Sequence, residues 1–144
     1  MLSPLLSLHR LTAIAHRGGS ALRPENTLAA FDNGVTLGAD ALECDVHVAR
    51  DGEVVVIHDP TLDRTTNAVG PVAALTSKEL ASVDAGFHFG AEAGHPYRGQ
   101  GIGVPRLHDL FERYREIPII VEIKGDDTTV VRSEEHTSEL QSRF

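Results

Sequence analysis

Three carboxylates interrupt strand-like segments that would otherwise be apolar. Glu43 and Asp45 stand two residues apart in ALECDVHV, and Glu122 stands near the end of IIVEIKG. Burying an unpaired charge costs about several kcal/mol, so such residues are expected to pair with cations, to bind a metal ion, or to do both. Carboxylates are hard oxygen ligands, which suit Mg²⁺ or Ca²⁺ better than Zn²⁺. The pattern therefore indicates a candidate site for a divalent cation.

Histidines and cationic side chains accompany these acids. His16 and Arg17 follow an apolar run in AHRGG, His58 ends the run VVVIHDP, and Lys124 follows Glu122 by two residues. Two histidines near a metal ion can divide general acid and general base work between them. Taken singly, each residue also has a plain structural explanation, as a histidine satisfied within the fold or as a partner in a salt bridge.

A predicted β-hairpin brings Asp45 and His58 together. The dipeptide Asp51-Gly52 between two strand-like runs is a signal for a two-residue turn. In the register that this turn imposes, Asp45 lies directly opposite His58, with Cβ atoms about 4.5–5.5 Å apart. Strand alternation puts Glu43 on the same face as Asp45 and leaves the other face apolar. The apolar face carries Leu42, Cys44 and Val46.

The predicted elements alternate between strand and helix. Strands are predicted at residues 12–16, 41–48, 54–57 and 117–123, and helices at 26–37, from a capping box at Thr76 to near Gly86, and at 106–116. This order predicts parallel strands joined by helical crossovers, with the last strand covered on both faces. Residues 61–105 are too long for a plain crossover and are predicted to form a small insertion.

Composition limits the classes of function. The chain has 144 residues, 41% hydrophobic and 24% charged, as expected of a globular domain with a hydrophobic core. A net charge of -8 without a basic cluster argues against nucleic acid as the main partner. The only cysteine, Cys44, excludes a disulfide framework and is predicted to be a small buried hydrophobe, which fits a reducing, cytoplasmic location. The N-terminal segment MLSPLLSLHRL is interpreted as neither a signal peptide nor a membrane span.

Several separated motifs resemble one enzyme family. They are AHRGG, PENTLAAF, ECDVHVARDGEVVVIHDPTLDRTT, PVAALTSKELASVDAG, VPRLHDLF and VEIKG, from about Ile14 to Gly125. In order and spacing they resemble the glycerophosphodiester phosphodiesterases of the phospholipase C-like superfamily. The resemblance implies an α/β fold, the N-terminal portion of a (β/α)8 TIM barrel with about three strands and a hairpin excursion after the second. It also implies metal-dependent hydrolysis of small-molecule glycerophosphodiesters to glycerol 3-phosphate and an alcohol.

The resemblance assigns a role to each matching residue. His16 and His58 would be the acid/base pair, and the glycerol hydroxyl next to the phosphate would attack phosphorus to give a cyclic phosphate that water then opens. The other assignments are Glu43, Asp45 and Glu122 as ligands of Mg²⁺ or Ca²⁺, Arg17 and Lys124 as phosphate-binding residues, and Glu25 and Asn26 as residues that line or brace the site. Four of the six further histidines are interpreted as follows: His47 as a bystander, and His88, His95 and His108 as surface residues.

The resemblance stops near Gly125, whereas a complete barrel needs about 250 residues. Residues 1–131 are therefore interpreted as a truncated domain, expected to be marginally stable because its sheet edge and one apolar face stay uncovered. The segment RSEEHTSELQS from Arg132 resembles a translated sequencing adapter, so residues 132–144 are interpreted as a non-native tail; the alternative is a native polar helix. Two other functions stay open, another phospholipase C-like phosphodiesterase and a non-catalytic fragment, as do the alcohol, the native ion and the oligomeric state.

Overall fold

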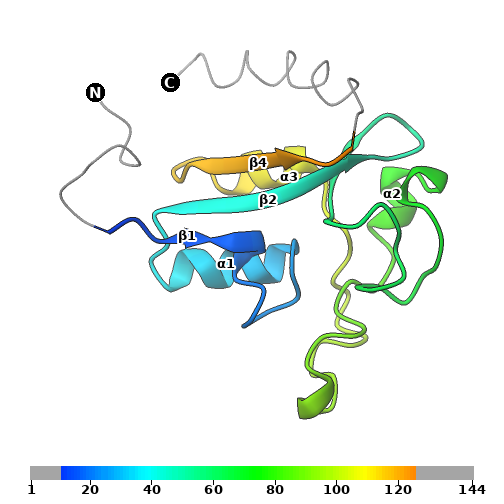
Figure 1. The fold of residues 1–144 in the computed structure, drawn as a ribbon, viewed down its shortest axis with the longest axis horizontal. Coiled ribbons are helices and arrows are strands. Elements are labelled where there is room, and N and C mark those ends of the chain that lie inside the picture. Colours follow the sequence, from blue (N-terminus) through cyan, green and yellow to red (C-terminus); the bar gives the residue numbers. More distant parts are fainter. Residues whose placement is uncertain (1–10, 126–144) are drawn as a thin grey trace.

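The computed structural model describes residues 11–125, so the interpretations of residues 1–10 and 132–144 lie outside the described part. The four strands are β1 (Ile14–Ala15), β2 (Ala41–Val48), β3 (Val54–Val56) and β4 (Ile119–Ile123). The α-helices are α1 (Leu28–Thr36), α2 (Ser77–Leu80) and α3 (Leu107–Arg113). Short 3₁₀ helices are η2 (His16–Gly18), η3 (Val72–Ala74) and η4 (Ala91–Ala93). Each predicted strand and helix is present, most of them shortened at their ends (Figure 1).

Strand β2 is the centre of the sheet and pairs with the other three strands. It runs parallel to β1, with Ile14 opposite Ala41, and parallel to β4, with Asp45 opposite Glu122. It runs antiparallel to β3. The predicted parallel arrangement of the first, second and last strands is therefore confirmed.

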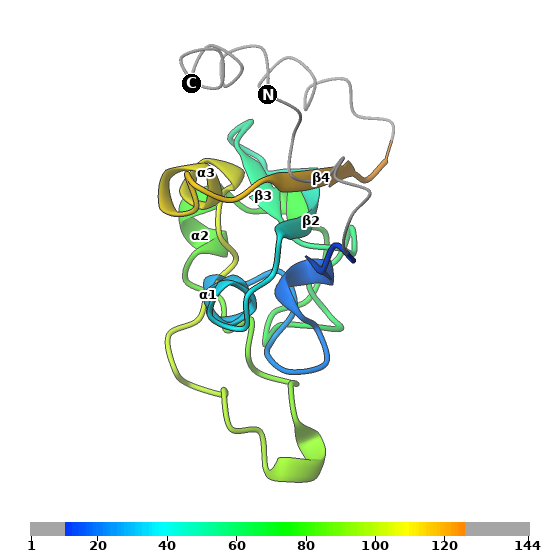
Figure 2. The same cartoon turned by 90° about the vertical axis from the view of Figure 1, so that its left-hand side faces the viewer.

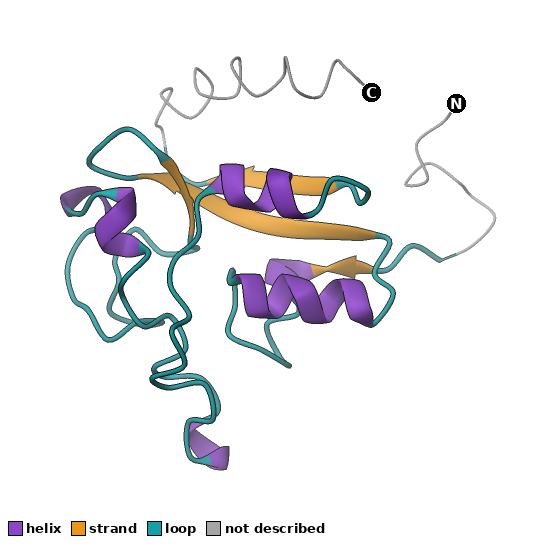
Figure 3. Cartoon of the chain, turned by 180° about the vertical axis from the view of Figure 1, so that it is seen from behind, coloured by secondary structure: helices purple, strands orange, loops and turns teal. Residues whose placement is uncertain are grey.

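Helices α1 and α3 cover one face of this sheet, as the view from behind shows (Figure 3). The core between them and the sheet contains Phe31, Leu42, Cys44, Val46, Val54, Val56, Leu107, Leu110 and Tyr114. Leu42, Cys44 and Val46 are each 0% exposed. The apolar side chains of β2 are therefore buried under helices, as their alternation with the acids predicted, and Cys44 is a core residue.

The turn after β1 packs closely on helix α1. The helix begins after Thr27, whose side chain accepts a hydrogen bond from the Ala30 amide, and Gly38 follows its end with a φ of 86°. A Cβ atom on Gly18 would lie 2.8 Å from both the Ala30 Cβ and the Phe31 amide nitrogen. Only glycine therefore permits this approach, which holds His16 and Arg17 at the carboxyl end of β1.

The hairpin has a different register from the predicted one. Val48 pairs with Val54, and the Ala49 amide donates to the Glu53 carbonyl at 2.9 Å, so three residues, 50–52, form the loop. Gly52, with a φ of 83°, supplies the left-handed residue that such a loop requires. The prediction that Asp45 lies opposite His58 is wrong, because the extra loop residue shifts the pairing and Ile57 donates its amide to the Asp45 carbonyl instead.

Strand β4 is covered on one face, not on both as predicted. Ile119 and Val121 pack against the core below α3, whereas Ile120 is 39% exposed. Ile120 lies opposite Glu43, on the face of the sheet that carries the acids. No helix of the described residues lies over that face, so the apolar run of β4 is only half buried (Figure 2).

The predicted insertion forms a second small core and then extends away from the sheet (Figure 2). This core joins residues of the hairpin to residues of the insertion. The hairpin contributes Ala49, Val55 and Ile57, and the insertion contributes Leu62, Val72, Leu80, Ala85 and Val104. Helix α2 has the predicted capping box at Thr76 but ends at Leu80, well before Gly86. The amides of residues 81–83 still bond within this turn, and the backbone then bonds to other segments. Asp84 exchanges hydrogen bonds with Asn67, and the Ala85 amide donates to the Ile102 carbonyl.

Three histidines of the insertion and of α3 were predicted to lie at the surface. His88 and His108 are exposed as expected, but His95 is half-buried with an enclosed Nδ1 atom and has a left-handed backbone with a φ of 57°. Within residues 11–125, every helix is too short or too polar to cross a bilayer.

Candidate active site

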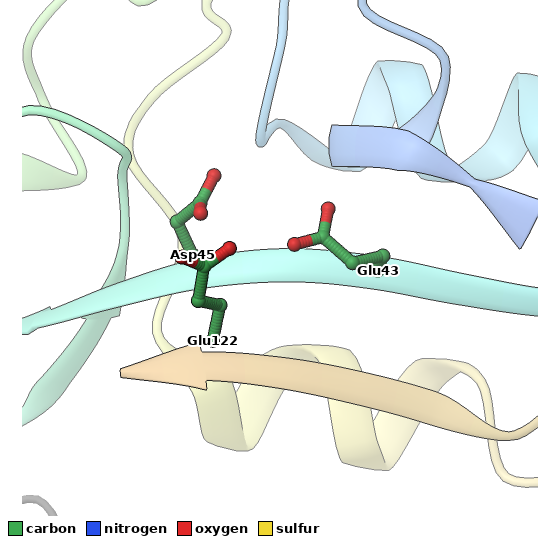
Figure 4. A group of neighbouring side chains, drawn as sticks. All are labelled: Glu43, Asp45 and Glu122. Atoms are coloured by element: carbon green, nitrogen blue, oxygen red, sulfur yellow. The ribbon is translucent and has the colours of Figure 1, made fainter. Parts of the chain in front are cut away.

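Three carboxylates meet on the uncovered face of the sheet. Glu43 and Asp45 project from β2, and the register of the parallel pair places Glu122 of β4 directly opposite Asp45 (Figure 4). One carboxylate oxygen from each residue lies within 4.8 Å of the other two. The predicted metal ligands are thus brought together by strand alternation and by the register of β2 and β4.

Asp45 is the most enclosed of the three and has the most partners. Its side chain is 1% exposed; its Oδ2 accepts a hydrogen bond from Asn26 Nδ2 at 3.0 Å, and its amide donates to Asn26 Oδ1 at 3.3 Å. Arg17 Nε lies 3.1 Å from Oδ2, and Lys124 Nζ lies 3.4 Å from Oδ1. These contacts fix the plane of the Asp45 carboxylate.

One oxygen of Asp45 fits a cation particularly well. Oδ1 is buried, and among the described residues it has the ion pair with Lys124 at 3.4 Å but no contact with the geometry of a hydrogen bond. A buried charged oxygen without a hydrogen-bond donor is costly unless another positive group contacts it. Together with the neighbouring carboxylates of Glu43 and Glu122, this oxygen offers a set of hard ligands suited to a divalent ion.

Glu43 connects the triad to the turn after β1. Its side chain is 12% exposed, and its Oε2 accepts a hydrogen bond from the Arg17 amide at 3.0 Å. The same oxygen lies 3.9 Å from Nε2 of His16, whose side chain is 64% exposed. Arg17 adopts a left-handed conformation with a φ of 52°, which a non-glycine residue keeps only where its surroundings hold it.

Lys124 lies between two of the carboxylates. Its Nζ donates a hydrogen bond to Glu122 Oε1 at 2.7 Å, in addition to the ion pair with Asp45. The hydrogen bond to Glu122 and the charge of Asp45 raise the pKa of Lys124 above its ordinary value. The ammonium group therefore stays charged near neutral pH and can attract an anion to the triad.

The imidazole of His58 is held by the next residue in the chain, Asp59. Its Nδ1 lies 2.7 Å from Asp59 Oδ1, and its carbonyl oxygen accepts a hydrogen bond from His47 Nε2 at 2.9 Å. Hydrogen bonds from Arg64 and from His58 lower the pKa of Asp59 well below its usual range. His47 is thus more than the expected bystander, because it supports the backbone of His58.

Glu25 and Asn26 contact different parts of the site. Asn26, with a φ of 56°, is 3% exposed and directs its amide group at Asp45. Glu25 accepts hydrogen bonds from Arg17 Nη1 at 3.3 Å and from Arg64 Nη2 at 2.7 Å. Both residues therefore contact other candidate site residues.

The structure places the predicted residues in two linked groups. His16, Arg17, Asn26, Glu43, Asp45, Glu122 and Lys124 surround the triad, whereas His58 lies beyond the end of β3 and is linked to the others through Asp59, Arg64 and Glu25. Asp59 and Arg64 were missed as site residues although both lie in HDPTLDRTT, part of a motif that carries the family resemblance. An acid directly after the candidate histidine was the available signal for Asp59.

Comparison with known proteins gives a consistent family assignment. The profile of the Glycerophosphoryl diester phosphodiesterase family matches residues 16–143. The chain is 45% identical, over 77% of its length, to the glycerophosphodiester phosphodiesterase of Caldanaerobacter subterraneus, of which it covers 43%. It is 34% identical to that of Bacillus subtilis, over 95% of this chain and 48% of the relative.

Solved structures agree with this assignment. A glycerophosphodiester phosphodiesterase from Agrobacterium tumefaciens is 39% identical with a TM-score of 0.75, and the match covers 86% of this chain and 52% of that one. An Oleispira antarctica phosphodiesterase in complex with the product sn-glycerol-3-phosphate is 34% identical with a TM-score of 0.69, over 79% and 44% of the two chains.

These matches also confirm the fold class. The described residues form part of a (β/α)8 barrel, with a partial parallel sheet in place of a closed one. The chain spans about half the length of the curated relatives it matches. It belongs to the glycerophosphoryl diester phosphodiesterase family.

Proposed function

We propose that this chain carries the metal-binding and acid–base part of an enzyme that hydrolyses glycerophosphodiesters to glycerol 3-phosphate and an alcohol. The observation that carries the proposal is the buried Asp45 Oδ1 atom, which lies near two further carboxylates and, among the described residues, has only a long ion pair with Lys124 at 3.4 Å. In this proposal Glu43, Asp45 and Glu122 hold Mg²⁺ or Ca²⁺. When bound, such an ion polarises the phosphodiester and stabilises the negative charge that develops on it.

The phosphate would be bound by Arg17 and Lys124. Both cations already contact Asp45, at 3.1 and 3.4 Å, so an anion at the triad would meet two positive groups. Asn26 would keep the Asp45 carboxylate in one orientation through its two hydrogen bonds. These residues would bind and orient the substrate, which reduces the entropy lost on reaching the transition state.

The two histidines would transfer protons. In the first step one imidazole accepts the proton of the glycerol hydroxyl next to the phosphate as that oxygen bonds to phosphorus. The other histidine gives a proton to the departing alcohol oxygen, and the P–O bond to it breaks. Water then opens the cyclic phosphate with the two histidines in exchanged roles. The contact of His58 Nδ1 with Asp59 supports this assignment, because it leaves Nε2 to exchange protons with the substrate.

The chain alone is expected to show little or no turnover. It spans about half the length of its relatives, and groups from the rest of a barrel would complete the substrate site. The half-length match also favours a second candidate, a chain that binds a divalent ion weakly without catalysis. A cytoplasmic setting, expected from the single buried cysteine, is part of the proposal.

A chimera separates these candidates. Residues 11–125 would replace the matching half of the Caldanaerobacter subterraneus enzyme, and release of glycerol 3-phosphate from glycerophosphocholine would be measured with Mg²⁺ or Ca²⁺. We expect turnover by the chimera, its loss in the His16→Ala and His58→Ala variants, and little turnover by the chain alone. A folded chimera without activity would contradict the enzyme proposal, and rapid hydrolysis by the chain alone would contradict the need for the second half.

A further inference from the structure

Arg64 is bound by two carboxylates that come from distant parts of the chain. Its Nη2 and Nη1 donate to Glu25 at 2.7 and 3.1 Å, and its Nε and Nη2 donate to Asp59 at 2.9 and 3.0 Å. Glu25 precedes helix α1, and Asp59 follows strand β3. One guanidinium group therefore joins the loop before α1 to the loop after β3.

Each of these carboxylates also contacts a residue of the proposed site. Asp59 Oδ1 lies 2.7 Å from His58 Nδ1, and Glu25 Oε1 accepts from Arg17 Nη1 at 3.3 Å. Arg17 in turn pairs with Asp45. The contacts form a continuous row of alternating charge from the candidate acid/base histidine to the candidate metal ligand.

We propose that Arg64 is a positioning residue that holds His58 and Arg17 in one mutual arrangement. The inference rests on the proposed function, since it concerns the same site. Without Arg64, the carboxylates of Glu25 and Asp59 would be two like charges with no cation between them. Glu25 would keep its hydrogen bond from Arg17, whereas Asp59 would turn toward solvent. The Asp59 carboxylate would then no longer fix the proton of His58 on Nδ1.

The geometry distinguishes this role from a simple contribution to stability. The side chain of Arg64 is 48% exposed, and exposed ion pairs contribute little to the free energy of unfolding. The planar guanidinium group of Arg64 nevertheless contacts both oxygens of both carboxylates. It thereby sets their orientation in a way that a lysine ammonium cannot reproduce. Loss of Arg64 is therefore expected to change the orientation of His58 more than the stability of the fold.

The first test measures the tautomer of His58 in the 144-residue chain labelled with ¹⁵N-histidine. Ring-nitrogen chemical shifts at high pH should show His58 protonated mainly on Nδ1. In the Arg64→Gln variant we expect the ratio of the two tautomers to change by about five- to tenfold, the effect of losing about one hydrogen bond. The matched control is Arg50→Gln, which removes another exposed arginine, paired with Glu79 at 3.1 Å on the hairpin. An unchanged tautomer ratio in Arg64→Gln would overturn the proposal.

The second test measures kinetics in the chimera described above. We expect Arg64→Gln to lower kcat by about 10- to 100-fold through misplacement of His58, while Arg50→Gln stays near the parent value. Arg64→Lys should recover only part of this loss, and it also serves if Arg64→Gln fails to fold. Equal activity in parent and Arg64→Lys would reduce the role of Arg64 to its charge and contradict the positioning role. If the parent chimera is inactive, the proposed function fails, while the tautomer measurement still decides the role of Arg64.

Discussion

The two faces of strand β2 are stabilised in different ways. Leu42, Cys44 and Val46 face helices α1 and α3 and are completely buried, so that face is held by non-directional apolar packing. Glu43 and Asp45 face away from the helices, and hydrogen bonds and ion pairs at defined distances hold them. Packing tolerates small shifts, whereas a row of charged groups depends on each partner. The comparison indicates that one face of β2 mainly stabilises the fold and the other mainly orients chemical groups.

The backbone differs between the two faces as well. Within residues 11–125, three non-glycine residues have a positive φ, and two of them, Arg17 and Asn26, lie at the acidic face and contact its carboxylates. Left-handed conformations of such residues cost about 1–3 kcal/mol and persist where surrounding contacts hold them. The apolar core is therefore expected to offset local strain at the site.

The largest expected effect on stability comes from the covered face. Leu42→Ala would remove a fully buried side chain and leave a cavity under α1, lowering the free energy of unfolding by about 2–5 kcal/mol. Urea unfolding followed by circular dichroism measures the change. A loss below about 1 kcal/mol would mean that the core relaxes around the cavity, and the two faces would then differ less than we infer.

Asn26→Ala is the next largest and acts on the acidic face. It removes two buried hydrogen bonds to Asp45 and places alanine at a φ of 56°, so we expect a loss of about 2–3 kcal/mol. Asn26→Gly removes the same bonds but tolerates the backbone, and the difference between the two variants in urea unfolding isolates the conformational cost. Equal stability of both variants would show that the backbone at residue 26 is not strained.

Acid is expected to weaken both faces through different carboxylates. Hydrogen bonds from Arg113 and Tyr114 lower the pKa of Asp32, and these bonds link α3 to α1. Hydrogen bonds from Arg64 lower the pKa of Asp59, which lies beside the site. The pKa of each carboxylate in the folded state lies below its unfolded value of about 3.9. Each carboxylate therefore stabilises the fold above that pH, and this stabilisation is lost as the pH falls through the folded pKa.

The urea midpoint should therefore decrease between pH 5 and pH 3, and less steeply in Asp32→Asn. A midpoint that is constant over this range would contradict both lowered pKa values. Asp59→Asn provides the corresponding measurement for the acidic face.

The smallest effect on stability is expected for Glu122→Gln, whose side chain is 55% exposed. We expect a change within about 0.5 kcal/mol in urea unfolding, as for most exposed substitutions. Titration calorimetry with Ca²⁺ should in contrast show at least a tenfold loss of affinity, because one of three carboxylate ligands is gone. Unchanged affinity would remove Glu122 from the proposed metal site, and a large loss of stability would mean that the acidic face also supports the fold.

Local sequence patterns predicted much of the fold. Strand β2 has the predicted bounds, the capping box at Thr76 is present, and the acids of β2 and β4 lie on one face as alternation requires. The predicted hairpin register is wrong because Asp51-Gly52 suits either a two-residue or a three-residue loop. The side chain of Asp51 also accepts hydrogen bonds from the amide and hydroxyl of Ser77, 26 positions further along the chain. No local pattern contains that distant contact.

For the candidate site, the sequence alone determined which residue types are available and which share a face of a strand, because the alternation of side chains is a local property of the backbone. It also determined the family, through motifs in HRGG, HDPTLDRTT and VEIKG. Only the tertiary structure decided that His58 reaches the site through Asp59, Arg64 and Glu25 and not through Asp45. Those contacts join loops far apart in the chain, and the packing of α1, the hairpin and the insertion on one sheet sets the distances between them.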